Sequence, residues 1–144
     1  MDISLVDLAA TFALAARVAA IMRPGDAILL EGPLGAGKTA FARALLRAAT
    51  ANPTLEVPSP TFTLMQSYET KRGMVHHFDL WRLTGPDGLI ELGWDDARDD
   101  IVLVEWPDRL GPLAPDQALT IRLVPGVEEA RIAHLHGWPD RLLP

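Results

Sequence analysis

The sequence contains no cysteine. Disulfide bonds, thiolate catalysis and cysteine-ligated metal sites are therefore excluded. It also has no run of about 20 apolar residues, the length that a membrane-spanning helix requires. The alanine-rich segment 1–22 is interrupted by Asp2, Asp7 and Arg17 and has no basic leader, so it does not have the pattern of a signal peptide. We expect the protein to stay in the cytoplasm.

Basic residues are few and dispersed. Thirteen Lys and Arg residues stand against 19 Asp and Glu residues, which gives a formal net charge of −6. A protein that binds nucleic acid by itself usually presents a clustered basic surface, because phosphate neutralisation supplies most of the affinity. The composition therefore predicts that any nucleic acid involved is held by a partner protein.

Repeats, low-complexity tracts and domain linkers are also missing. The chain has 144 residues, of which 49% are hydrophobic and 22% are charged. This balance is typical of a globular protein, and the length suffices for one hydrophobic core. We expect residues 1–144 to form a single domain.

The first part of the sequence predicts a helix, a strand and a second helix. Asp7 is placed to cap a helix that ends before Pro24-Gly25. The wholly apolar run 27–30 is typical of a buried strand in a parallel sheet, and residues 38–49 predict another helix. The apolar positions expected on the core side of the first helix are Leu8, Phe12, Ala15, Ala19 and Met22.

The later part predicts more strands and little helix. Residues 61–68 and 74–78 flank the turn 71–73 and predict a hairpin. A short helix is expected around residues 89–92, and segment 94–100, with four aspartates, is expected to be a solvated surface. The other strand candidates are the apolar run 101–104 and the alternating segments 119–124 and 131–136, which suit half-exposed strands near a sheet edge.

One motif predicts phosphate binding. Residues 32–39, Gly-Pro-Leu-Gly-Ala-Gly-Lys-Thr, fit G-x-x-x-x-G-K-[ST] in full. The glycines let successive backbone N–H groups point at phosphate oxygens, and the following helix adds the positive end of its dipole. A chance glycine-rich turn is the alternative, but the placement between an apolar strand and a helix favours the functional reading. The residues expected to contact the nucleotide here are Pro33, Leu34, Gly35, Ala36, Gly37, Lys38, Thr39 and Ala40.

The order of strand, phosphate loop and helix also predicts the fold. We expect an α/β protein with the three-layer P-loop NTPase fold. Its mixed sheet should be mostly parallel, with antiparallel additions from the hairpin and the C-terminal strands.

Two acids are candidates for a magnesium site with Thr39. Glu105 follows the apolar run 101–104, and P-loop enzymes commonly place such an acid at the end of a buried strand. A charged residue just beyond a strand is also common without any metal. Asp79 ends the strand 75–78, where capping the next turn is the alternative role. The adjacent His76 and His77 should point to opposite faces of that strand, so they are not expected to share a metal.

These residues resemble the TsaE (formerly YjeE) family, the ATPases of bacterial tRNA threonylcarbamoyladenosine synthesis. The resemblance extends over about residues 4–123. It rests on five segments in the family's order: LEGPLGAGKT at 30–39, SPTFTL at 59–64, HFDLWRL at 77–83, ELGW at 91–94 and VEWP at 104–107. Trp81 stands where the family usually has tyrosine, and Pro33 where aspartate or asparagine is more frequent.

The resemblance implies roles for several site residues. It implies that Asp79 and Glu105 both lie near the magnesium ion and that Thr39 is a direct ligand. It implies that residues 59–63 form a switch-like loop near the γ-phosphate, in which Thr61 senses the nucleotide state. It also implies that Trp106 flanks the site and couples it to partners.

The resemblance also implies partners. Family members bind a heterodimer of TsaB and TsaD, in which TsaD transfers the threonylcarbamoyl group to adenosine 37 of ANN-decoding tRNAs. ATP hydrolysis by the TsaE subunit resets that complex between turnovers. The acidic net charge agrees with this arrangement, since the basic tRNA-binding surface would belong to the partners.

The expected reaction is magnesium-dependent attack of water on the γ-phosphate of ATP. Lys38 and the metal would offset the charge that develops between the β- and γ-phosphates. Either Asp79 or Glu105 would orient the water, and the sequence leaves both open. No arginine finger is evident, so we expect hydrolysis to be slow until a partner completes the site. The arginines available in the chain are Arg43, Arg82 and Arg109.

Two other functions remain open at this point. One is a small P-loop kinase of a small molecule or nucleotide, although clustered lid arginines do not follow the phosphate loop. The other is a nucleotide-gated binding module whose hydrolysis is incidental. Thr11 and Phe12 are candidates for contacts with the adenine.

Overall fold

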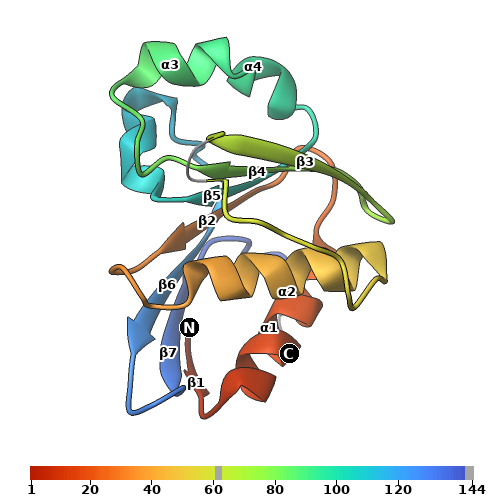
Figure 1. Cartoon of the computed structure of the whole chain (residues 1–144), viewed down its shortest axis with the longest axis vertical. Helices are drawn as coiled ribbons and strands as arrows, with labels where there is room; N and C mark the ends of the chain where they lie inside the picture. Colours follow the sequence, from red (N-terminus) through yellow and green to blue (C-terminus); the bar gives the residue numbers. More distant parts are fainter. Residues whose placement is uncertain (61–62, 142–144) are drawn as a thin grey trace.

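The computed structural model of the chain describes residues 1–60 and 63–141. Over these residues the strands form one mixed sheet with helices on both faces (Figure 1). The strands are β1 (Asp2–Leu5), β2 (Ala27–Glu31), β3 (Met65–Thr70), β4 (Gly73–Asp79), β5 (Ile101–Glu105), β6 (Leu119–Pro125) and β7 (Arg131–His136). The helices are α1 (Leu8–Ile21), α2 (Lys38–Thr50), α3 (Pro86–Glu91), α4 (Trp94–Ala97) and the 3-10 segment η1 (Pro107–Leu113). None of the helices in this part of the chain has the length and apolar character needed to cross a membrane.

The centre of the sheet is parallel. Over the described residues the strand order is β1-β7-β6-β2-β5-β4-β3. β2 pairs in parallel with β5 and with β6, and β5 pairs in parallel with β4. The antiparallel additions are β3 beside β4 and the pair β7 and β1 beside β6. The predicted mixed, mostly parallel sheet is confirmed.

β6 lies inside the sheet, between β2 and β7, where the sequence suggested a strand near an edge. Its alternation of buried and exposed residues has another cause. Leu119, Ile121 and Leu123 enter the core beneath α1 and α2, whereas Arg122 on the opposite face is exposed. The side chains alternate because helices cover only one face of the sheet at this strand.

Two apolar clusters form the layers on either side of the sheet. On one face α1 and α2 pack against β2 and β5, and on the other face α3, α4 and η1 pack against β4 and β5 (Figure 1). The expectation that segment 94–100 is a solvated surface is wrong for Trp94, which is only 2% exposed. The centre of its ring lies 5.2 Å from that of Phe78, in an edge-on arrangement. Asp95 and Asp96 of the same short helix are exposed as expected. A helix of four residues can bury one side and expose the other, which a count of its charges does not reveal.

α1 begins where the sequence predicts. The Asp7 side chain accepts a hydrogen bond of 2.9 Å from the backbone N–H of Ala10 and so caps the helix. The face that α1 buries is rotated about the helix axis relative to the face predicted from the sequence. As a result Phe12, which was expected on the core side, is 46% exposed. The residues that α1 buries are Thr11, Leu14, Ala15, Val18 and Ala19.

Gly137 fixes the end of β7 against the start of β6. Its φ is 112°, and a Cβ atom there would overlap the carbonyl oxygen of Ala118. We expect Gly137→Ala to lower the free energy of unfolding by about 3 kcal/mol, because the steric overlap adds to the strained backbone angle. The matched change is Gly25→Ala, where φ is 93° but nothing lies within 4 Å of the new methyl group. That variant should lose only about 1–2 kcal/mol in urea unfolding, and equal losses in both variants would contradict the steric argument.

Candidate functional site

The site lies at the carboxyl ends of three neighbouring parallel strands. β2 leads into the loop before α2, β4 ends at Asp79, and β5 ends at Glu105. Asp79 and Glu105 are register partners across β4 and β5, and Leu30 of β2 is the partner of Glu105 on its other side. Ligands bind at this edge of open α/β sheets, since the strands deliver side chains there from several directions.

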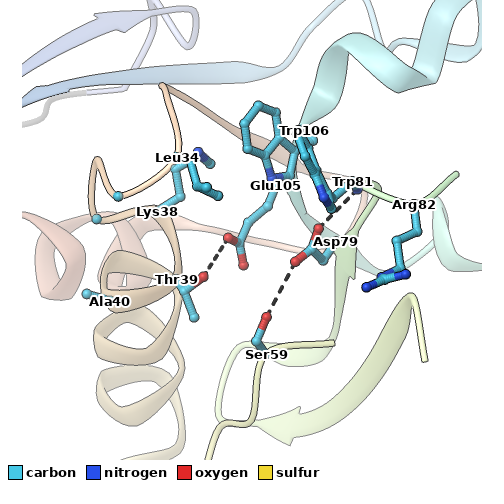
Figure 2. A pocket seen from close by; sticks show the side chains of 12 residues that line it. Leu34, Lys38, Thr39, Ala40, Ser59, Asp79, Trp81, Arg82, Glu105 and Trp106 are labelled. Atoms are coloured by element: carbon cyan, nitrogen blue, oxygen red, sulfur yellow. Dashed lines mark hydrogen bonds between the residues drawn. The ribbon is translucent and has the colours of Figure 1, made fainter. Parts of the chain in front are cut away.

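A pocket of about 420 Å³ opens at this edge (Figure 2). It is lined by Leu34, Gly35, Gly37, Lys38, Thr39, Ala40, Ser59, Asp79, Trp81, Arg82, Glu105 and Trp106. Most of the residues predicted to contact nucleotide or metal are therefore brought together. Pro33 and Ala36 do not line the pocket with their side chains, and Ala36 is fully buried. Thr61 lies outside the described residues.

The phosphate loop presents the start of a long helix to the pocket. Gly37 is the N-cap residue of the 13-residue helix α2, with φ 101° in the left-handed region and no side-chain cap. Glycine takes up this backbone angle without the penalty that a Cβ atom would impose. The first N–H groups of α2 thus have no capping side chain and face the pocket, where the helix dipole favours an anion.

Lys38 is folded into the loop that precedes it. It is 5% exposed, and its Nζ donates hydrogen bonds to the carbonyl oxygens of Gly32 at 2.6 Å and Pro33 at 2.9 Å. The same nitrogen lies 3.9 Å from the centre of the Trp106 ring. Burial lowers the pKa of the Lys38 ammonium, while the carboxylates of Glu105 and Asp79 act in the opposite direction. A phosphate group would meet a largely desolvated cation here, which strengthens the attraction.

Glu105 is buried and connects two elements. It is 1% exposed, its Oε1 accepts a hydrogen bond of 2.8 Å from the Thr39 hydroxyl, and its Oε2 lies 2.7 Å from His77 Nε2. Oxygen atoms of hydroxyl and carboxylate groups suit Mg²⁺, which proteins usually bind through one or two carboxylates together with substrate phosphates. The side chains of Thr39 and Glu105 therefore fit a nucleotide-bound magnesium ion. Residues 1–60 and 63–141 contain no group of three or more His, Asp and Glu residues that could hold a metal by themselves.

Asp79 caps the turn that follows β4. Its Oδ1 accepts a hydrogen bond of 3.1 Å from the backbone N–H of Trp81, which is the turn-capping role considered above. Its Oδ2 accepts a longer bond of 3.4 Å from the Ser59 hydroxyl. Figure 2 shows both contacts beside the Thr39–Glu105 pair. Asp79 thus contacts Ser59, the first residue of the loop that the family resemblance implies to be switch-like.

Two tryptophans form one wall of the pocket. The rings of Trp81 and Trp106 lie 4.5 Å apart at an angle of 44°, and the Arg109 guanidinium lies 5.7 Å from the Trp81 ring. Trp106 follows Glu105 directly and has a φ of 59°, which is uncommon for a residue with a side chain. Trp81 is 43% exposed. This wall therefore reaches from the buried Lys38 to the protein surface.

Two residues at the site were not predicted as part of it. Arg131 of β7 donates a hydrogen bond of 2.7 Å from Nε to the carbonyl oxygen of Ala36 and so supports the phosphate loop. Nothing in the local sequence signals this contact, because the two residues are 95 positions apart. His77 precedes Asp79 by two residues and therefore shares its strand face, a spacing that could have indicated its contact with Glu105.

The candidates for adenine contacts lie in different surroundings. Thr11 is 2% exposed, and its hydroxyl donates a hydrogen bond of 3.4 Å to the carbonyl oxygen of Asp7, the N-cap residue of α1. Phe12 lines a second pocket of about 390 Å³ between α1 and α2. Ala40 borders both this pocket and the phosphate site.

Comparison with known proteins identifies the family. Residues 5–133 match the family described as "Threonylcarbamoyl adenosine biosynthesis protein TsaE". The chain is 36% identical over 111 residues to the tRNA threonylcarbamoyladenosine biosynthesis protein TsaE of Rickettsia felis, a match that covers 76% of this chain and 64% of that protein. It is 39% identical over 102 residues to the Aquifex aeolicus protein of the same name, covering 71% of this chain and 73% of that protein. With the Nostoc protein of that name it is 34% identical over 138 residues, covering 92% and 83%.

The fold has a solved counterpart. The crystal structure of Bacillus subtilis YdiB matches with a TM-score of 0.73 and 25% sequence identity, over 97% of this chain and 86% of that chain. The sequence relatives and the family match agree with the motifs at the pocket, and they confirm the resemblance inferred from the sequence. The chain belongs to the TsaE family of tRNA threonylcarbamoyladenosine biosynthesis proteins.

Proposed function

We propose that this chain is the ATPase subunit of the bacterial machinery that forms N6-threonylcarbamoyladenosine at A37 of tRNA. The observation that carries the proposal is the 2.8 Å contact between Thr39 and Glu105, beside the buried Lys38 at the start of α2. A phosphate loop, a cation, a hydroxyl group and a carboxylate in one pocket are the parts that P-loop phosphoryl transfer uses.

Nucleotide binding would rest on the loop and the first turn of α2. Backbone N–H groups of residues 34–39 would hold the phosphates, and Lys38 would exchange its two carbonyl contacts for phosphate oxygens. Trp106 would close the side of the pocket next to Lys38. The residues that we propose to contact ATP are Pro33, Leu34, Gly35, Ala36, Gly37, Lys38, Thr39, Ala40, Thr61 and Trp106.

The metal and the water would be held from the strand ends. When bound, Mg²⁺ would offset the negative charge of the β- and γ-phosphates. The Thr39 hydroxyl and the Glu105 carboxylate would hold the ion directly or through water, with Asp79 close by. Since Thr39 contacts Glu105 while Asp79 faces Ser59, we assign Glu105 to the metal side and Asp79 to orientation of the attacking water.

The proposed partners are the TsaB and TsaD homologues. The net charge of −6 supports the proposal that tRNA is bound by the partners and reaches this chain only through them. The same proposal places the protein in the cytoplasm as a single ATPase domain. Hydrolysis by the isolated chain is expected to be slow, and the partners would complete the site.

The test is formation of modified tRNA over many turnovers. Purified TsaB–TsaD, tRNA and the threonylcarbamoyl donor would be mixed with or without this chain, and modified nucleoside would be counted per TsaD molecule. We expect sustained turnover only with this chain and ATP, and at most one round with a non-hydrolysable ATP analogue, because resetting requires hydrolysis. Equal turnover with the analogue would instead indicate a nucleotide-gated binding module. ATP consumption that depended on an added small acceptor and ignored TsaB–TsaD would indicate a kinase.

A further inference from the structure

The buried His77 contacts the carboxylate group of Glu105, the acid that we propose to hold the metal ion. His77 and Glu105 have side chains that are 0% and 1% exposed, and His77 Nε2 lies 2.7 Å from Glu105 Oε2. The other carboxylate oxygen, Oε1, accepts the hydrogen bond from Thr39. The Glu105 carboxylate is therefore held at both oxygens, by β4 on one side and by the phosphate-loop helix on the other.

The surroundings of His77 define which nitrogen carries the proton. An ionised carboxylate can only accept, so His77 Nε2 must donate to Glu105. Within the described residues, His77 Nδ1 is buried and has no hydrogen-bond partner. A proton on Nδ1 would be an unsatisfied buried donor, whereas a bare lone pair there is less costly. The geometry thus favours a proton on Nε2, directed at Glu105 Oε2.

This hydrogen bond determines the direction of the second oxygen. The two oxygens of a carboxylate lie in one rigid plane, so fixing Oε2 limits rotation of the group and leaves Oε1 directed toward Thr39. Partners of this kind orient ligating carboxylates in metal sites, and removing them typically weakens metal binding on the order of 10- to 100-fold.

We propose that His77 is a positioning residue that holds Glu105 Oε1 toward the Thr39 hydroxyl, where the Mg²⁺ of a nucleotide complex would bind. This inference rests on the proposed function, since it requires Glu105 to serve the metal. His77 itself would contact neither the ion nor the nucleotide. Its effect is therefore on the affinity for Mg²⁺ and not on contacts with the nucleotide.

The experiment measures binding of a fluorescent N-methylanthraniloyl derivative of ADP, first in EDTA and then during a Mg²⁺ titration. His77→Phe keeps a ring of similar size but removes the donor. We expect it to raise the half-saturating Mg²⁺ concentration on the order of 10- to 100-fold, while nucleotide affinity in EDTA changes less than about twofold. His77→Gln can place an amide N–H near the position of Nε2, so it should recover most of the Mg²⁺ affinity.

A matched control is available at the next residue. His76 lies on the opposite face of β4 and contacts Asp100 at 2.9 Å and Ser67 at 2.7 Å, away from the pocket. His76→Phe should leave the Mg²⁺ titration unchanged. If His77→Phe does not fold, His77→Asn serves instead, since its shorter amide does not reach Glu105 and should behave like the phenylalanine variant.

The outcomes separate this inference from the proposed function. If Glu105→Gln shifts the Mg²⁺ titration but His77→Phe and His77→Asn do not, the positioning role of His77 is wrong and the proposed function stands. If Glu105→Gln causes no shift either, the metal role of Glu105 fails, and the His77 inference fails with it. Equal losses in His77→Gln and His77→Asn would also overturn the inference, because only the glutamine can replace the hydrogen bond.

Discussion

Lys38→Ala is expected to lower the TsaB–TsaD-stimulated rate of ATP hydrolysis by about 10³-fold, the loss typical of removing a main electrostatic contact of a transition state. The reason is the position of the ammonium group, which is almost fully buried and lies at the start of α2 against the phosphate loop. A buried cation is already stripped of most of its water, so little reorganisation is needed when charge develops on the phosphates. Steady-state phosphate release at saturating ATP and Mg²⁺ would measure the effect.

Lys71→Ala is the matched control. Lys71 is the only other lysine in the sequence, and it lies exposed in the turn between β3 and β4. Both variants lose one positive charge, so a general effect of net charge on partner binding would appear in both. Retention of more than a tenth of the rate in Lys38→Ala would show that the Lys38 ammonium is not a main electrostatic contact of the transition state. Thermal unfolding of both variants would exclude loss of the fold as the cause.

Glu105→Gln and Asp79→Asn should both reduce hydrolysis strongly, but in different ways. Glu105→Gln keeps the shape and leaves one oxygen to accept the hydrogen bond of Thr39, but it removes the charge and its NH2 group cannot accept the hydrogen bond of His77. We expect its Mg²⁺ requirement to rise on the order of 10- to 100-fold. Asp79→Asn should keep the Mg²⁺ requirement of the unmodified protein and lose about 10²-fold or more in the maximal rate, since a positioned general base contributes about that much.

The two variants would be compared by titrating Mg²⁺ in the presence of TsaB–TsaD and saturating ATP. Asp108→Asn is a suitable control, because Asp108 is an acid near Lys38 that does not line the pocket. The opposite pattern is a raised Mg²⁺ requirement in Asp79→Asn alone. It would assign Asp79 to the metal ion and Glu105 to the attacking water. Normal rates in both variants would remove the acids from the mechanism.

Much of this site could be predicted because its parts are local in the sequence. The phosphate loop is one continuous motif, and its flanking strand and helix are distinct in composition. Asp79 and Glu105 were identified because each ends a predicted strand, which is wholly apolar in the case of Glu105. The family resemblance added that both acids serve the same site. The sequence pattern by itself does not say which strands are neighbours, so the pairing of β4 with β5 came only from the structure.

The parts that could not be predicted depend on distant contacts or on very short elements. β1 has four residues, too few to display a periodic pattern. Arg131 reaches Ala36 only because β7 returns beside β6, and no local feature encodes that return. The exposure of Phe12 follows from how α1 is rotated on the sheet, which several similar apolar spacings would allow. Trp94 is buried by Phe78, which lies 16 positions earlier in the sequence.

The register of β4 and β5 has a mechanical consequence. Asp79 and Glu105 are directly opposite each other on adjacent parallel strands, so the distance between their backbones is set by the interstrand spacing of about 4.8 Å. The hydrogen-bond ladder therefore holds the backbones of the two acids at a constant separation as the nucleotide changes, and only their side chains can adjust. Ser59 contacts Asp79 from the connection between α2 and β3, so we expect tightening around the γ-phosphate to involve that connection. Attempts to alter the speed of the catalytic cycle should vary that connection and leave the strand ends intact.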